Sequence, residues 1–307
     1  MDSSKEKKLS QKTVKKNFST IGLLLILYIF MVMLIPYAFR YFVIESGSDI
    51  FDDEIIYYGI YFIFLVLGTF IPFFIMKKRF IDKRKKIMKQ IDATFVDLFV
   101  QTIVFFTICI ALTYVSNILL NYLGLEGKLI SGIGLNYEEA GLDNILYIFM
   151  LVFVSPILEE YAFRGVLLNS LSRYSNNFAL YATSIIFALA HNNFAEMIPA
   201  FAMGVALGKT SLRYKSIQPT IVIHILFNAF LYCLFILPVS ISQYLAYGLV
   251  AICLIAFILV LTGRYEKIHI QRSKSNAIAN KLFYSRFTII LSMILMIGFT
   301  CVFTFLE

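Results

Sequence analysis

The chain has 307 residues, of which 60% are hydrophobic and only 15% are charged, and its mean hydropathy is +0.80. This composition is too apolar for a soluble globular protein and predicts an integral membrane protein. The net charge of +8 does not indicate a nucleic-acid partner, because the cations lie in short segments between apolar runs, where they act as topology signals.

Apolar runs along the chain predict an all-α, polytopic membrane protein with about eight to nine transmembrane helices. A helix needs about 20 apolar residues to cross a hydrocarbon core of roughly 30 Å. The first run follows a basic start but is too long for the apolar part of a signal peptide, so we expect a retained span. The predicted spans are residues 21–43, 55–76, 95–122, 144–169, 177–191, 197–212, 217–238, 243–263 and 287–305.

The charges between these runs predict the orientation of the chain. Six lysines lie in residues 1–20 and eight lysines and arginines in residues 77–89, whereas the loops around residues 45–54 and 126–143 are mainly acidic. Because cytoplasmic loops carry the excess of cations, we expect a cytoplasmic N-terminus. We interpret residues 77–92 as a solvated basic loop, with an amphipathic helix on the membrane surface as the alternative.

The fifth and sixth predicted spans are short. We expect them to form a hairpin whose outer end stops inside the membrane, where non-helical backbone is tolerated only beside protein or a water-filled cavity. Gly204 and Gly208 lie four residues apart in the sixth span, a pattern that lets two helix backbones approach closely.

A small set of strongly polar residues interrupts the apolar runs. An ionised side chain at the centre of a span costs roughly 2.5 to 3.5 kcal/mol on insertion scales, so such residues are expected to have partners or a function. Two pairs within the set are four residues apart, which places each pair on one face of its helix. The set comprises Glu159, Glu160, Arg164, His191, His224 and Asn228.

The depths of these residues predict that they meet. At 1.5 Å per residue, Glu159 lies roughly 16 Å, His191 roughly 21 Å and His224 roughly 13 Å from the cytoplasmic ends of their helices. These depths agree within modest helix tilts. We therefore expect one carboxylate, two imidazoles and the carboxamide of Asn228 to line one intramembrane cavity.

Hydrolysis by an activated water molecule is the chemistry open to this cluster. The chain has no Gly-x-Ser-x-Gly or His-Glu-x-x-His motif, and its four cysteines lie in apolar runs as packing residues. A partly desolvated glutamate can take a proton from water, and histidine or asparagine can stabilise the oxyanion that develops. We expect Glu159 to be the base, because Arg164 would hold Glu160 ionised in a structural ion pair.

Three motifs resemble those of the CPBP family, which comprises the CAAX prenyl endopeptidases and the bacteriocin-processing intramembrane proteases and is also called the Abi family. The resemblance covers about residues 155–230, and no motif position is substituted. The motifs are Glu159-Glu160-x-x-x-Arg164, Phe187-x-x-x-His191 and His224-x-x-x-Asn228, with Pro156, Phe163, Gly165, Gly204 and Gly208 agreeing as neighbours.

The resemblance implies an intramembrane endopeptidase core in which Glu159 and His191 activate water. By the same comparison, His224 and Asn228 would form the oxyanion hole. Family members cleave peptides or protein tails near the membrane, so we expect a membrane-associated peptide or protein substrate. The residues expected to support the site are Glu160 and Arg164.

The resemblance and the charge pattern together divide the chain into four parts. We expect a protein of the lipid bilayer, in a bacterial plasma membrane, with a possible membrane protein partner and no nucleic acid. The parts are a basic cytoplasmic tail (1–20), N-terminal transmembrane helices with outer loops (21–142), the protease core (143–238) and C-terminal transmembrane helices (239–307).

Three alternatives remain open at this point. The two glutamates and two histidines could bind zinc, although asparagine is a poor zinc ligand and we expect no cofactor. The chain could be a non-catalytic membrane scaffold or a bacteriocin self-immunity protein that acts on a partner such as a sensor kinase. It could also be a transporter, since ionisable groups in membranes mark ion pathways, but it shows no internal repeat.

Overall fold

The computed structural model describes residues 10–47, 54–82, 86–88, 95–123, 142–236 and 274–305, together with the single positions 241, 244, 248 and 251. Every regular element in these residues is a helix, which confirms the all-α fold class. Most of the predicted eighth span, residues 243–263, and most of the outer loop before residue 142 lie outside the described residues.

Fewer helices in these described parts meet the requirements for a membrane span than the sequence predicts. Four are long and apolar enough: Gln11–Val43, Tyr58–Phe80, Gln101–Tyr122 and Ile145–Ser172. The count becomes five if the bent pair Ala277–Tyr284 and Phe287–Val302 forms one span. A total of eight to nine spans therefore stays a prediction.

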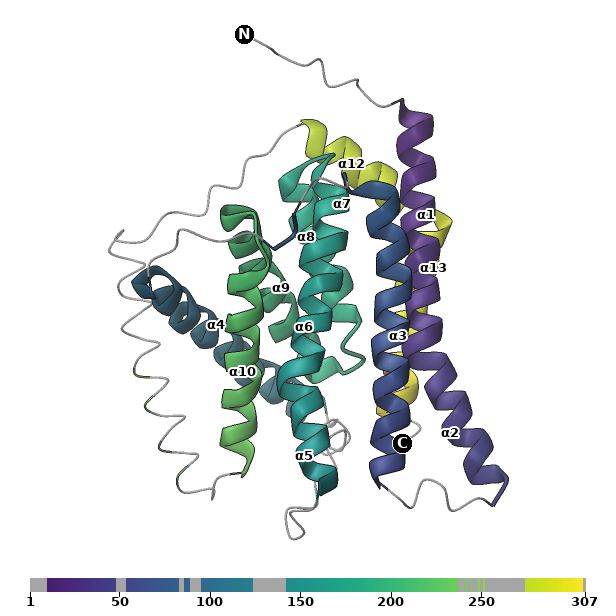
Figure 1. Cartoon of the computed structure of the whole chain (residues 1–307). Helices are drawn as coiled ribbons and strands as arrows, with labels where there is room; N and C mark the ends of the chain where they lie inside the picture. Colours follow the sequence, from purple (N-terminus) through teal and green to yellow (C-terminus); the bar gives the residue numbers. More distant parts are fainter. Residues whose placement is uncertain are drawn as a thin grey trace.

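The first span is longer than its apolar run. Helix α1 (Gln11–Ile29) continues through a π-helical turn, residues 30–34, into α2 (Ile35–Glu45). Ser10 begins α1 as its N-cap, because the Thr13 backbone N–H donates to the Ser10 side chain over 3.2 Å. Residues 11–20, which we expected in the basic tail, thus form the first turns of α1. Helix α3 (Glu54–Phe80) returns beside α1 (Figure 1).

A composite helix crosses the middle of the fold and contains two π-helical segments. It runs without a break from Leu142 to Ser172, whereas the sequence predicts a plain span at 144–169. A π-helix is wider than an α-helix and turns the residues after it onto a new face. In order, the segments are α5 (Leu142–Phe149), a π segment (Met150–Val154), α6 (Ser155–Glu159), a second π segment (Glu160–Leu168) and α7 (Asn169–Ser172).

A short hairpin packs against the composite helix. Helix α8 (Asn176–Leu189) and α9 (Phe194–Tyr214) are antiparallel, and their turn lies well short of the far ends of α3 and α5 in Figure 1. The two backbones nearly touch at Gly204, where an added Cβ would lie 2.8 Å from the Ser184 Cα. This arrangement agrees with the predicted hairpin and with the close approach expected from the glycine pattern.

Of the remaining helices, α4 (Phe95–Tyr122) and α10 (Gln218–Ile236) pack against the hairpin or the composite helix, and α12 (Lys274–Tyr284) and α13 (Phe287–Phe305) pack against α1. Helix α4 packs on α9, and α10 packs beside α6. Helix α12 meets α13 at 71°. Helix α13 lies along α1, where Gly22 admits the backbone of Ile289.

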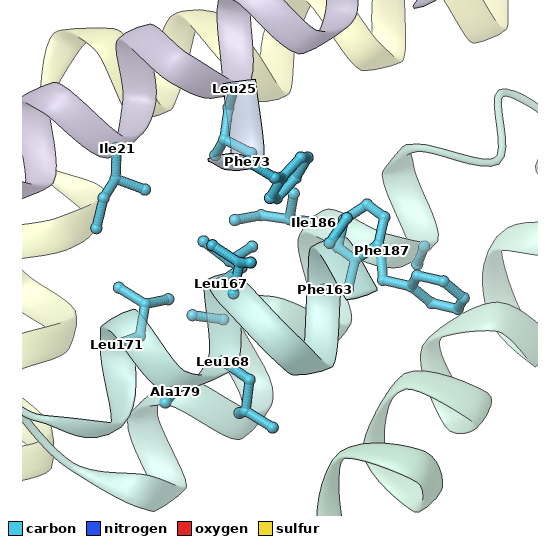
Figure 2. Packing of buried hydrophobic residues seen from close by; sticks show 14 of the residues in the cluster. Ile21, Leu25, Phe73, Phe163, Leu167, Leu168, Leu171, Ala179, Ile186 and Phe187 are labelled. Atoms are coloured by element: carbon cyan, nitrogen blue, oxygen red, sulfur yellow. The ribbon is translucent and has the colours of Figure 1, made fainter. Parts of the chain in front are cut away.

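The core lies where α1, α3, the composite helix and α8 meet. Figure 2 shows Leu25 of α1 and Phe73 of α3 directed towards Phe163 and Leu167 of the composite helix. Phe187 of α8 lies beside Phe163, with ring centroids 5.1 Å apart. This apolar packing holds the composite helix and α8 in a fixed relation, and both carry residues of the polar set.

Candidate active site

The second π segment places Glu160 and Arg164 in the protein interior. Arg164 is 1% exposed and Glu160 is 0% exposed. Arg164 Nη1 lies 2.9 Å from Glu160 Oε1, so the expected ion pair is present. The Arg164 guanidinium also lies over the Phe187 ring at 4.0 Å, in the geometry of a cation–π interaction. A carboxylate held in this way has no route to a substrate.

His224 of α10 contacts both glutamates through different ring nitrogens. His224 Nδ1 lies 3.0 Å from Glu160 Oε1, and its Nε2 lies 3.9 Å from Glu159 Oε2. Because an ionised carboxylate only accepts hydrogen bonds, Nδ1 carries a proton and donates to Glu160. Glu160 therefore fixes the tautomer and ring orientation of His224 and leaves Nε2 facing Glu159, as a carboxylate does in a His–Asp pair.

Glu159 differs from its neighbour in exposure. Its side chain is 24% exposed, against 0% for Glu160. Ser155 Oγ donates a 2.6 Å hydrogen bond to Glu159 Oε1, while Oε2 is buried and has no hydrogen-bond partner among the described residues. Glu159 is thus held by one oxygen, and the other oxygen faces His224 across a gap too long for a direct hydrogen bond.

His191 follows the last turn of α8 and is also held by one nitrogen. Its Nδ1 lies 2.8 Å from the Phe187 backbone oxygen. Since a carbonyl oxygen can only accept, Nδ1 is the donor and Nε2 of a neutral ring is left to accept a proton. The Phe187 ring lies 4.7 Å from the His191 ring and 6.3 Å from the His224 ring. Phe187 thus packs against both imidazole rings as well as against Phe163 in the core.

Asn228 lies one turn beyond His224 on α10. Its Nδ2 donates a 2.9 Å hydrogen bond to the backbone oxygen of Leu151, in the first π segment of the composite helix. One of its two N–H groups is therefore used in a contact between helices.

The sequence reasoning missed Glu196 in the first turn of α9. Its Oε1 accepts a hydrogen bond from Asn193 Nδ2 over 3.2 Å, and the residue lies within electrostatic range of His191 and Glu159. Asn193 is the N-cap of α9, and the Ala195 N–H donates to its side chain. The signal in the sequence is a carboxylate within a predicted membrane hairpin.

The described part of the chain contains no group of three or more histidine, cysteine, aspartate or glutamate side chains arranged to hold a metal ion. Glu160 Oε1 and His224 Nδ1 already bind each other. The arrangement instead contains a partly exposed carboxylate, two imidazoles with defined tautomers and a buried ion pair. These groups can activate a water molecule and stabilise a developing negative charge.

Comparison with known proteins identifies the segment that carries this cluster. Residues 141–230 match the family model of the Rce1-like type II CAAX prenyl endopeptidases. The chain is also 35% identical over 92 residues to the membrane-embedded CAAX protease MroQ of Staphylococcus aureus strain USA300. Residues 141–230 belong to the CPBP family. This confirms the family resemblance inferred from the three motifs.

The CPBP match is limited to the central part of the chain. The aligned segment is 28% of this chain and 37% of MroQ, so the chain spans little more than a third of that relative's length. No solved structure matches the chain. The family and the apolar helices together make the chain an integral membrane protein.

Proposed function

We propose that this chain is an intramembrane endopeptidase that hydrolyses a membrane-proximal peptide bond with Glu159 as the base. The observation that carries the proposal is the pairing of a partly exposed Glu159 with a buried Glu160 around His224. The CPBP match and the name of the relative, a protease, support the reaction class. Glu160 is buried and orients His224, so Glu159 is the carboxylate that is free to act on water.

The groups of the site account for each proton in the reaction. Glu159 Oε2, assisted by His191 Nε2, takes a proton from water as the water oxygen attacks the carbonyl carbon of the substrate. The carbonyl oxygen becomes negative, and His224 Nε2 donates to it when the ring is protonated, a charge that Glu160 balances. Asn228 adds only a minor second donor, through the N–H that Leu151 does not use. Glu159 then returns its proton to the leaving amine as the C–N bond breaks.

The expected substrate is a membrane-associated peptide or protein tail, because the site lies among apolar helices. We propose that the reaction needs no metal, since Glu160 is engaged with Arg164 and His224, and one oxygen of Glu159 with Ser155. We also propose a cytoplasmic N-terminus, from the charge pattern, and a bacterial plasma membrane, in line with the bacterial source of the relative. A membrane protein partner is compatible with this proposal and is not required by it.

The decisive experiment measures cleavage by purified protein in vesicles of phosphatidylglycerol and phosphatidylcholine. The probe is a mixed library of short quenched fluorescent peptides, each with a C-terminal palmitoyl group that anchors it to the vesicle. We expect Glu159→Gln, His191→Ala and His224→Ala each to lower the rate by about 100-fold or more, as for the loss of an essential catalytic group. The matched controls are Glu45→Gln, at the exposed end of α2, and His269→Ala, which is not a member of the polar set.

The outcomes separate catalysis from a scaffold role. Wild-type cleavage rates in both Glu159→Gln and His224→Ala would show that the proposal is wrong. In cells, membrane and secreted peptides are compared between strains with the active protein and with Glu159→Gln. If the strain with Glu159→Gln behaves in every respect like the strain with the active protein, a scaffold or immunity protein is favoured over a protease.

A further inference from the structure

The backbone oxygen of Leu151 lacks the donor that a helix normally supplies. In the first π segment, the Ser155 N–H donates to the Met150 oxygen, five residues back. The Leu151 oxygen would next be paired with the N–H of residue 155 in an α-helix or of residue 156 in a π-helix. The Ser155 N–H is already used, and residue 156 is proline, which has no N–H.

The Asn228 side chain occupies the place of that missing donor. Its Nδ2 lies 2.9 Å from the Leu151 oxygen and belongs to α10, a different helix. The orientation of the carboxamide follows from chemistry, because a carbonyl oxygen requires a donor and only the nitrogen end of the amide can donate. A carbonyl left unpaired inside an apolar bundle is destabilising, so this contact compensates for Pro156.

We infer that Asn228 is a positioning residue, which replaces the hydrogen bond withheld by Pro156 and so locks α10 to the composite helix beside Glu159. His224 and Asn228 are one turn apart on α10, while Pro156 and Glu159 are three residues apart on the composite helix. The contact between Asn228 and Leu151, together with the hydrogen bond between His224 and Glu160, therefore sets the height of His224 relative to Glu159. The inference rests on the proposed peptidase function, and it assigns the main contribution of Asn228 to this contact rather than to the oxyanion.

The proline offers a rescue experiment. Asn228→Leu removes the donor and keeps the number and branching of the side-chain heavy atoms, and Pro156→Ala restores a backbone N–H that can reach the orphaned carbonyl. Four purified proteins are compared: wild type, N228L, P156A and P156A/N228L. Each is measured by its thermal unfolding midpoint in detergent and by cleavage of the anchored peptide library.

We expect N228L to lower the unfolding midpoint by about 2 to 4 °C and the cleavage rate by about tenfold or more. The unfolding midpoint of the double variant P156A/N228L should lie within about 1 °C of that of P156A alone. Its cleavage rate should lie within about threefold of the rate of P156A. N228A and P156A/N228A repeat the comparison in case leucine disturbs the packing. Recovery in either pair supports the positioning role.

Two results would overturn the inference. One is a double variant that is no more stable than N228L and N228A, since Pro156 would then be unrelated to Asn228. The other is recovery of the midpoint without recovery of cleavage, which would leave Asn228 as an oxyanion donor. If the wild type cleaves no peptide, the proposed function fails, but the unfolding midpoints still decide whether Asn228 compensates for Pro156.

Discussion

Replacing Arg164 with methionine tests the buried ion pair that organises the site. Glu160 and Arg164 are almost fully buried, and their charged atoms lie 2.9 Å apart. The R164M substitution leaves the Glu160 carboxylate in an apolar interior without its cation. Breaking a buried pair in this way costs about 3 to 5 kcal/mol, and part of that loss is the contact of the guanidinium with Phe187.

The assay is reversible unfolding of the purified protein in mixed detergent and sodium dodecyl sulfate, followed by far-ultraviolet circular dichroism. Arg79→Met at the exposed end of α3 is the matched control, and its free energy of unfolding should stay within about 0.5 kcal/mol of wild type. The double variant E160Q/R164M should recover most of the stability, because neither partner then leaves an uncompensated charge. It should remain inactive, since His224 loses the carboxylate that orients its ring.

Two results would refute this reasoning. If R164M unfolds with the free energy of wild type, the pair does not stabilise the fold. If E160Q/R164M is as unstable as R164M, the loss comes from packing around the arginine rather than from an unpaired charge. Either result would also weaken the assignment of Glu160 as the group that orients His224.

Two further predictions concern single contacts, and a third concerns the dependence of cleavage on metal. Ser155→Ala removes the hydrogen bond to Glu159 and should lower kcat/KM on the anchored peptide library about tenfold with the fold intact; an unchanged kcat/KM would show that Ser155 does not position the base. Gly204→Ala should lower the free energy of unfolding by about 1 to 3 kcal/mol, because the added methyl group meets the Ser184 backbone, whereas Gly298→Ala in open space on α13 should not; equal effects would contradict the close helix contact. Removing metals with 1,10-phenanthroline should leave cleavage unchanged if the protein is a glutamate peptidase, and loss of cleavage that zinc restores would favour the zinc alternative.

Much of the fold could be predicted from hydropathy because the membrane imposes helices. The bounds of α4, α9 and α10 lie within a few residues of the predicted spans, since a long apolar run has to satisfy its backbone internally. The start of α1 at Gln11 was missed, because a basic, amphipathic turn that extends beyond the apolar run has no hydropathy signal. The π segments were missed too, because they depend on packing and on Pro156 rather than on composition.

The candidate site, like the fold, could be predicted from the sequence only in part. The sequence by itself determined that a membrane protein carries two glutamates, an arginine, two histidines and an asparagine at similar depths, since charges are rare in apolar runs and their spacing defines helix faces. Only the tertiary structure decided that Glu160 is buried against Arg164 and His224, while Glu159 stays partly exposed. It also decided which nitrogen of each imidazole is free. Adjacent residues on one helix differ in burial and in hydrogen-bond partners only through the helices packed around them, and no local pattern records that packing.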